Sequence, residues 1–260
     1  MVTGFERPLA RAEVGLATTS FYDGATIEWN GERATAIRNG DDRAAKLWAT
    51  IQAAARDGID LLVAPELTVT PDARRWIVQQ LRWPSEAPHA EASTNRLALV
   101  VPGSFHEQVG DRFVHRAIAF GGSGNALLEH HKLVSYGSLS DVVEDIHLGD
   151  TITVLITPIG TVAIAICKDF CDDHMGAIWH EIQPQWLLVP AYGPGESAHK
   201  AAAARIDRMV GTVTVLAHQG DTTRNTPFRS FIHDAGKPTE THSNSPDFSG
   251  YKVAILKRKP

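Results

Sequence analysis

The stretch from Val162 to Asp173 reads VAIAICKDFCDD, an apolar run that ends on Cys167 and is followed at once by Lys168 and Asp169. A run this apolar is typical of a strand that is buried on both faces, as in the parallel sheets of α/β proteins. The residue that ends such a strand lies at the rim of the core, where α/β proteins place their reactive groups. Cys167 is therefore a candidate functional residue from its position alone.

The composition around this stretch is that of a globular protein with one large core. Of the 260 residues, 43% are hydrophobic and 21% are charged, which is ordinary for a soluble protein. We expect a single domain over residues 1–260. The formal net charge is −5 and no long Lys/Arg run is present, which argues against nucleic-acid binding. There is no apolar leader and no run of about 18 apolar residues, so we expect a cytoplasmic protein with no membrane contact.

The two cysteines, Cys167 and Cys171, form neither a disulfide framework nor a C-x-x-C motif. With His174 they could supply three zinc ligands, but a structural zinc site takes four. We therefore expect no metal and no cofactor, and we interpret Cys171 as a packing residue. The twelve histidines stand singly or as His130-His131, and most are expected to be surface or hydrogen-bonded core residues.

Strand-like apolar runs alternate with helical patterns along the rest of the chain. Helices are predicted over residues 43–57, 71–82 and 198–211, and the segment 22–42 is interpreted as a loop. Strands are predicted over residues 14–21, 59–66, 97–105, 112–120, 127–133, 151–158, 161–167, 186–192, 212–220, 229–236 and 251–257. The GGSG of residues 121–124 predicts a hairpin between two of these strands. This alternation predicts one α/β domain with a mixed sheet arrangement.

Three polar residues end or flank buried runs: Glu66 after LLVAP, Lys132 at the end of ALLEHHK, and Cys167 after VAIAI. Each alone has an ordinary interpretation, as a helix cap, a solvated lysine or a small buried side chain. Together they suit acyl chemistry. A nucleophilic cysteine needs a lowered pKa or a nearby base, and an adjacent ammonium favours the thiolate. A carboxylate at the rim of an apolar sheet has a raised pKa and can move protons, while a lysine can stabilise an oxyanion.

The order Glu, Lys, Cys, carried on PEL (residues 65–67), HHKL (130–133) and ICKD (166–169), resembles the nitrilase superfamily of carbon–nitrogen hydrolases. The resemblance covers most of the chain and implies a four-layer α-β-β-α sandwich with mixed sheets, commonly assembled as a homodimer or higher homo-oligomer. It implies Glu66 as general base, Lys132 as transition-state stabiliser and Cys167 as nucleophile. Relatives often carry a further glutamate between the lysine and the cysteine, and Glu144 in DVVEDIHLGD is the best match.

The chain departs from the pattern of these relatives at three places. Lys168 follows the nucleophile where relatives often have an aromatic or acidic residue, and the hairpin reads Val114-His115-Arg116 where they commonly carry Asn. The helix after WLLVPAY reads RIDRM over residues 205–209 in place of the usual Arg-Ala-x-Glu-Asn. These departures bear on the substrate and the dimer interface rather than on the three principal residues.

The resemblance predicts a hydrolase that cleaves a non-peptide carbon–nitrogen bond in a small amide, N-carbamoyl compound or nitrile through a thioester on Cys167. We expect Lys132 and a backbone N–H, that of Lys168, to hold the oxyanion. The Lys168 side chain starts beside the pocket and is a candidate substrate-binding group for acidic substrates, unless its long stem turns outward into water. Asp169 is expected to be a buried or turn-stabilising carboxylate rather than a catalytic one.

Three other functions remain open at this point. A papain-type Cys–His hydrolase leaves Glu66 and Lys132 without a role, and no local sequence marks its histidine. A catalytically inactive nitrilase-like module could keep the sandwich for binding or regulation. An acyltransferase would pass the same thioester to an amine instead of water. The reactivity of Cys167 toward iodoacetamide and product analysis with added amine separate these functions.

Overall fold

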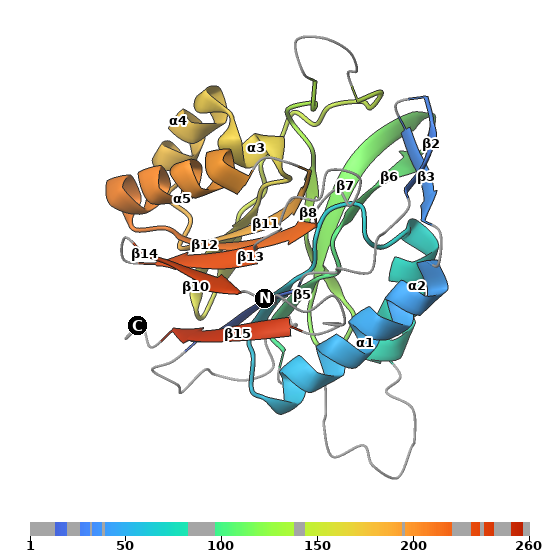
Figure 1. The fold of residues 1–260 in the computed structure, drawn as a ribbon, viewed down its shortest axis with the longest axis horizontal. Coiled ribbons are helices and arrows are strands. Elements are labelled where there is room, and N and C mark those ends of the chain that lie inside the picture. The colour runs from blue at the N-terminus through green and yellow to red at the C-terminus, as the bar shows by residue number, and fades with distance from the viewer. Residues whose placement is uncertain are drawn as a thin grey trace.

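The computed structural model describes residues 14–19, 27–31, 33–37, 40–82, 97–137, 144–193, 196–219, 230–234, 237–241 and 251–256. Within these ranges the chain forms two large sheets and one small two-stranded sheet, with helices on the outer sides of the large ones (Figure 1). The ends of several predicted strands, residues 20–21, 220, 229, 235–236 and 257, lie outside the described residues.

The first large sheet contains parallel strands at its centre. In order it consists of β15 (Tyr251–Leu256), β1 (Val14–Thr19), β4 (Leu61–Val63), β5 (Leu99–Val101), β7 (Arg112–Phe120) and β6 (Ser104–Val109), with β8 (Ala126–His131) also paired to β7. β1, β4 and β5 are parallel, whereas β15 and β7 run antiparallel to their neighbours. β7 and β8 form the predicted hairpin.

The second large sheet is also mixed. In order it consists of β14 (Lys237–Thr241), β13 (Ser230–Asp234), β12 (Val213–Gln219), β11 (Trp186–Tyr192), β10 (Gly160–Ile164) and β9 (Leu155–Thr157). β10, β11 and β12 are parallel. Because parallel strands place their carboxyl ends at one edge of a sheet, the residues that follow β10 and β11 lie close together there.

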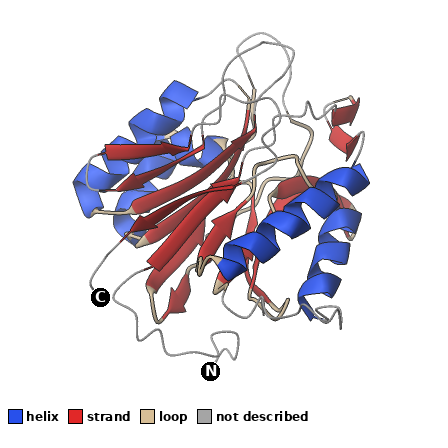
Figure 2. Cartoon of the chain, turned by 60° about the horizontal axis from the view of Figure 1, so that its bottom comes forward, coloured by secondary structure: helices blue, strands red, loops and turns tan. Residues whose placement is uncertain are grey.

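Helices cover the outer face of each large sheet. α1 (Gly40–Arg56) and α2 (Pro71–Arg82) pack on the first sheet, and α4 (Asp173–Ile182) and α5 (Glu196–Val210) pack on the second, with the short α3 (Lys168–Cys171) beside them. Figure 2 shows the strands between these two groups of helices. The expected four-layer α-β-β-α sandwich with mixed sheets is confirmed.

The two-residue period of β4 explains how the layers are held together. Leu61 and Val63 belong to the hydrophobic core between the two sheets, whereas Leu62 and Ala64 belong to the core under α1 and α2. Successive strand residues point to opposite faces, so a strand between two apolar layers must be apolar throughout. This explains the unbroken apolar runs of the sequence.

The structure differs from the sequence prediction in the segment 22–42. It was interpreted as loop, but it contains β2 (Ile27–Asn30) and β3 (Arg33–Ile37), which pair as a hairpin, and the start of α1. That interpretation was wrong because β2 buries one residue in four, so it lacks the apolar run by which the other strands are recognised.

The segment after Cys167 contains two helices, α3 and α4, that were not predicted from the sequence. The cue for α4 is Asp172, whose side chain accepts the backbone N–H groups of His174 and Met175 at 2.9 and 3.2 Å. This is the usual N-cap arrangement. β14 and the second half of β6 were not predicted either. Most other predicted helices and strands differ from the observed ones by a few residues at their ends.

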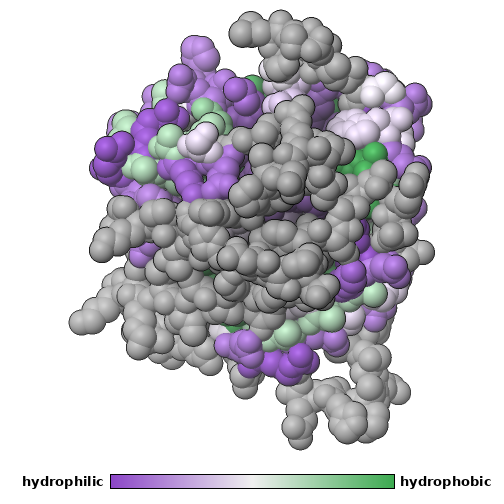
Figure 3. Space-filling view, viewed as in Figure 1, coloured by the Kyte–Doolittle hydropathy of each residue, from purple (hydrophilic) through white to green (hydrophobic). Residues whose placement is uncertain are grey.

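The outer surface over α4 and α5, at the upper left in Figure 3, is mainly hydrophilic with a few apolar residues among the polar ones. None of the helices in the described part of the chain is long and apolar enough to cross a bilayer. The expected homodimer stays a prediction.

A buried histidine pair predicts how stability depends on pH. The rings of His199 and His218 lie 5.6 Å apart between centroids, and burial, together with the charge of His199, lowers the pKa of His218 to about 3. The unfolded chain, with a histidine pKa near 6.5, then binds a proton that the folded chain does not bind. Stability is therefore fully present above about pH 6.5 and falls as the pH drops below it.

We expect the free energy of unfolding to fall by roughly 2 to 3 kcal/mol through His218 alone between about pH 7.5 and pH 4.5. Urea denaturation at both pH values measures this loss. His218→Gln should remove that part of the pH dependence, while the exposed His174→Gln should not change it. An equal loss in the parent and in His218→Gln contradicts the assignment.

Candidate active site

Glu66 lies just beyond the end of β4, where the first sheet meets the second. Its backbone N–H donates to the carbonyl of Ala191 in β11 at 3.4 Å, and the residue as a whole is 3% exposed. The neighbouring loop approaches closely at Gly103, which has φ 93°. A Cβ at that position would lie 2.3 Å from the carbonyl oxygen of Pro65, so glycine is required there.

Lys132 follows β8 and is held by its backbone. Its N–H donates to the carbonyl of His115 at 2.8 Å, and its carbonyl accepts the N–H of Gly149 at 2.8 Å. The buried ammonium lies between two carboxylates, with Nζ at 3.0 Å from Oε1 of Glu66 and 2.8 Å from Oε2 of Glu144. A buried charge needs such partners because leaving it unpaired costs several kcal/mol.

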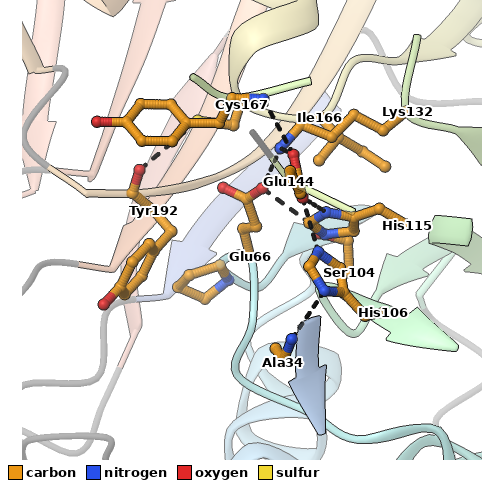
Figure 4. A network of polar contacts seen from close by, with 12 residues as sticks. Ala34, Glu66, Ser104, His106, His115, Lys132, Glu144, Ile166, Cys167 and Tyr192 are labelled. Atoms are coloured by element: carbon orange, nitrogen blue, oxygen red, sulfur yellow. Dashed lines mark hydrogen bonds and ion pairs between the residues drawn. The ribbon is translucent and has the colours of Figure 1, made fainter. Parts of the chain in front are cut away.

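Cys167 ends the apolar run on a sharp turn between β10 and α3. Its φ of 46° and ψ of −97° lie in a sparsely populated region, which costs an L-residue about 1 to 3 kcal/mol. The backbone N–H donates to the carbonyl of Pro190 at 2.9 Å, and Sγ lies 3.6 Å from the carbonyl oxygen of Tyr192. The turn therefore aims the thiol toward the end of β11 and toward Glu66 (Figure 4).

Asp169 fixes this turn against the segment that carries the lysine. Its buried Oδ1 accepts the backbone N–H groups of Leu133 and Val134 at 3.0 and 2.8 Å. Its Oδ2 accepts the N–H of Ile166 at 3.2 Å and lies 2.8 Å from Nε2 of His130. The expectation of a buried, structural carboxylate is confirmed, because every one of these contacts joins backbone segments or a core histidine.

Glu144, predicted from the resemblance as a further site residue, lies beside Lys132. Its Oε1 lies 2.7 Å from Nε2 of His106 and 2.6 Å from Nδ1 of His115. Its Oε2 contacts the lysine and accepts the backbone N–H of Tyr136 at 3.1 Å. The structure thus brings together four of the five predicted site residues, and Figure 4 shows their side chains converging. The fifth, Lys168, is half-buried at the start of α3.

The electrostatics of the cluster define a protonated thiol. Burial and the charge and hydrogen bond of Glu66 raise the pKa of the Cys167 thiol far above its usual range, although Lys132 acts in the opposite direction. Burial opposes the charge of Lys132, but Glu66 and Glu144 outweigh it and raise the lysine pKa. The ammonium of Lys132 does favour the thiolate, as expected, but burial and Glu66 outweigh it in the resting site. The thiol needs a base.

The neighbouring groups have fixed protonation states as well. Burial opposes ionisation of Glu144, but His115, His106 and Lys132 outweigh it and hold its pKa well below the usual range. Burial and the charge of Lys132 lower the pKa of His115. The cluster thus contains an ionised Glu144, a charged Lys132 and a neutral His115.

Among the described residues, one group of three potential metal ligands converges, His106, His115 and Glu144, with ligand atoms within 4.8 Å of one another. Hydrogen bonds from both rings to the carboxylate already account for this arrangement. Cys171 packs half-buried against the main core, as predicted, and His174 is exposed at the start of α4.

Sequence reasoning did not assign a role to His106 or His115. The one cue was the position of His115, in a hairpin where related sequences commonly carry Asn. His106 gave no cue, because the segment that contacts its ring, β3, was not recognised as a strand.

A buried glutamate, lysine and cysteine at the strand ends of an α-β-β-α sandwich define the class of carbon–nitrogen hydrolases. The family model for carbon-nitrogen hydrolases matches residues 38–182, and the chain belongs to this family. The resemblance to the nitrilase superfamily is confirmed.

Among individual relatives, the chloroplastic omega-amidase of Arabidopsis thaliana is 26% identical over an alignment that covers 50% of this chain and 39% of that protein. The chain therefore spans less than half the length of this curated relative. Among solved structures, an amidase from Nesterenkonia sp. has 16% identity and a TM-score of 0.68, covering 95% of this chain and 91% of that one. Saccharomyces cerevisiae Nit3, a member of branch 10 of the nitrilase superfamily, has 15% identity and a TM-score of 0.66, covering 98% and 92%.

Proposed function

We propose that this protein hydrolyses the carbon–nitrogen bond of small amides through a thioester on Cys167. The observation that carries the proposal is the position of Lys132, whose Nζ lies 3.0 Å from Glu66 and 2.8 Å from Glu144 beside the buried thiol. A protonated thiol next to an ionised carboxylate and a fixed ammonium has a base for its proton and a positive charge for the oxyanion.

The reaction would begin when Glu66 takes the Cys167 proton and the thiolate attacks the carbonyl carbon. Lys132 and the backbone N–H of Lys168 would stabilise the oxyanion of the tetrahedral intermediate. We assign the N–H of Lys168 to this role because the first N–H of a helix has no intrahelical acceptor. The intermediate would collapse as the protonated Glu66 gives its proton to the departing amine, leaving a thioester.

Hydrolysis of the thioester would use the same groups in a second cycle. Glu66 accepts a proton from water, and the resulting hydroxide attacks the thioester carbon. Collapse of the second intermediate releases the acid and the Cys167 thiolate, which recovers its proton from Glu66. Glu144 takes no proton in this scheme, because both of its oxygens are occupied by donors. Its role is to hold Lys132.

The structural relatives support small amides as the substrate class. A Glu-to-Gln mutant of the amidase from Nesterenkonia sp. AN1 has been solved with the acetamide moiety of fluoroacetamide covalently added at the active-site cysteine. A double mutant with a further Cys-to-Ala change has been solved in complex with acrylamide, and the Cys-to-Ala mutant in complex with butyramide. The omega-amidase name of the Arabidopsis relative indicates the same reaction type.

A substrate panel tests the proposed function. Aliphatic amides, N-carbamoyl compounds and nitriles are assayed for ammonia release, and intact mass spectrometry follows the acyl adduct on the protein. Ammonia release from amides with a transient adduct at Cys167 supports hydrolysis. Product formation only when an amine is added supports an acyltransferase, and neither ammonia nor an adduct from any compound supports an inactive binding module.

A further proposal concerns substrate charge. We propose that the half-buried Lys168 side chain favours substrates with a carboxylate or phosphate near the scissile carbon, because it directly follows the nucleophile. Lys168→Met should then lower kcat/KM on an acidic amide about tenfold more than on a neutral amide of the same length. The selective loss should shrink as salt rises. An equal effect on both amides assigns the lysine stem to packing instead.

A further inference from the structure

Two histidines on adjacent strands share one acceptor. His106 of β6 and His115 of β7 lie directly opposite each other in the antiparallel pair. Both are buried, and their rings meet edge to face at 4.6 Å between centroids. Their Nε2 and Nδ1 atoms, respectively, lie 2.7 and 2.6 Å from the same oxygen, Oε1 of Glu144.

The surroundings of each ring determine which nitrogen carries its proton. Nδ1 of His106 accepts the backbone N–H of Ala34 at 2.9 Å, so the proton is on Nε2 and is donated to Glu144. The ionised carboxylate of Glu144 can only accept from Nδ1 of His115, so the proton of this neutral ring is on Nδ1. Its Nε2 lies 2.9 Å from the Ser104 hydroxyl, which then donates to it, and 3.6 Å from Oε1 of Glu66. The two neutral rings therefore present opposite tautomers to one carboxylate oxygen.

The two oxygens of Glu144 therefore have different partners: Oε1 accepts from both histidines and Oε2 contacts Lys132. With two donors on Oε1, the carboxylate cannot rotate without breaking both hydrogen bonds, and Oε2 stays directed at Nζ of Lys132. If Glu144 turned away, the ammonium would pair with Glu66 alone. That pairing would draw Lys132 toward Glu66 and away from the oxyanion.

We propose that His106 and His115 are positioning residues that fix Glu144 through opposite tautomers and thereby set the place of Lys132 between the two glutamates. The inference rests on the proposed function only where it assigns catalytic consequences to Lys132. Neither histidine touches the thiol or receives a substrate proton in this scheme.

The β2–β3 hairpin is part of the same arrangement. Besides the Ala34 N–H that fixes the tautomer of His106, Arg33 pairs with the Asp145 carboxylate at 2.6 Å and donates to its carbonyl at 3.2 Å. Its guanidinium also lies 4.4 Å from the ring centroid of Phe113. The hairpin therefore contacts both the residue after Glu144 and one of the histidines that bind it.

Exchange of Asn and Gln at the two positions tests the proposal. An Asn amide can place its nitrogen near the Nδ1 position of a histidine, and a Gln amide near the Nε2 position. His106→Gln and His115→Asn keep a donor toward Glu144 and should retain kcat within about threefold. His106→Asn and His115→Gln lose that donor and should lower kcat about thirtyfold or more, with KM changed little.

The decisive result is that Gln retains more activity than Asn at position 106, whereas Asn retains more than Gln at position 115. A role in packing alone predicts that the smaller Asn is worse than Gln at both positions, and that order would overturn the proposal. The rate at which iodoacetamide alkylates Cys167 at a fixed pH gives a readout without turnover. Because Lys132 lowers the thiol pKa, this rate should fall only in the two donor-lacking variants. Unchanged rates in both would also overturn it.

The partly exposed hairpin offers variants that leave the core intact. Arg33→Met should lower kcat about threefold to tenfold, since its contacts to Asp145 are partly screened by solvent, and Thr35→Val on the outer face of β3 should leave kcat unchanged. Equal kcat in these two variants removes the hairpin from the arrangement.

If the parent releases ammonia but the Asn/Gln pattern is absent, the positioning proposal fails alone. If the parent forms no thioester, the proposed function fails, while the alkylation rates still test the positioning.

Discussion

Cys167→Ala is expected to abolish turnover while leaving the fold intact. The thiol is the proposed nucleophile, and its place in the turn between β10 and α3 aims it at Glu66 and the end of β11. Alanine meets the same backbone strain as cysteine at φ 46°, so the turn should form equally well. Ammonia release from a small amide measures activity, and urea denaturation measures stability.

Cys171→Ala is the matched control for this variant. Cys171 lies on α3 four residues after the nucleophile and packs half-buried against the core. Its replacement should cost about 1 kcal/mol or less of stability and should keep turnover near that of the parent. Comparable activity in Cys167→Ala and the parent rules out the thioester mechanism.

Glu66→Gln is expected to lower kcat at least about a hundredfold, because an amide cannot accept a proton from the thiol or return it to the leaving amine. The variant should fold, since Lys132 and Glu144 then form a balanced pair at 2.8 Å in place of one ammonium between two carboxylates. Single-turnover and steady-state assays on a good substrate measure the loss. Retained turnover removes Glu66 from the mechanism.

The same variant should change the thiol in the opposite direction. The charge of Glu66 raises the pKa of Cys167, and Lys132 lowers it. When Gln replaces Glu66, the positive charge of Lys132 is no longer offset by a carboxylate, so the pKa of the thiol should fall. Alkylation by iodoacetamide near neutral pH should then become faster although turnover is lost. Slower alkylation in Glu66→Gln means that the carboxylate is not what raises the thiol pKa.

Lys132→Arg is the companion to this experiment. It keeps the positive charge but replaces a compact ammonium by a larger, planar guanidinium. The space is bounded by the carboxylates of Glu66 and Glu144, which lie 3.0 and 2.8 Å from Nζ of Lys132. We expect a loss of roughly a hundredfold in kcat. Activity equal to that of the parent means that Lys132 supplies charge without a defined position.

Most strands and helices, and the three polar residues that end or flank buried runs, could be predicted from the sequence alone, whereas the four-layer arrangement was implied by the resemblance to the nitrilase superfamily. Strands that are buried on both faces must be apolar throughout, so the runs that end near Glu66 and Cys167 are visible without a structure. The polar residue that interrupts such a run is equally visible. The helical spacing of residues 43–57 and 71–82 gave α1 and α2 for a similar reason, because an amphipathic helix repeats its apolar positions every turn.

The tertiary structure decided everything that depends on neighbours far apart in the chain. The protonation of Cys167 follows from burial and from Glu66, about a hundred residues earlier, and no local pattern contains that contact. The hairpin of β2 and β3 is polar on its outer side and is held largely by contacts such as those of Arg33 with Asp145 and of Ala34 with His106. Hydrogen bonds and ion pairs of this kind need two groups within about 3 Å, and only the folded chain brings them to that distance.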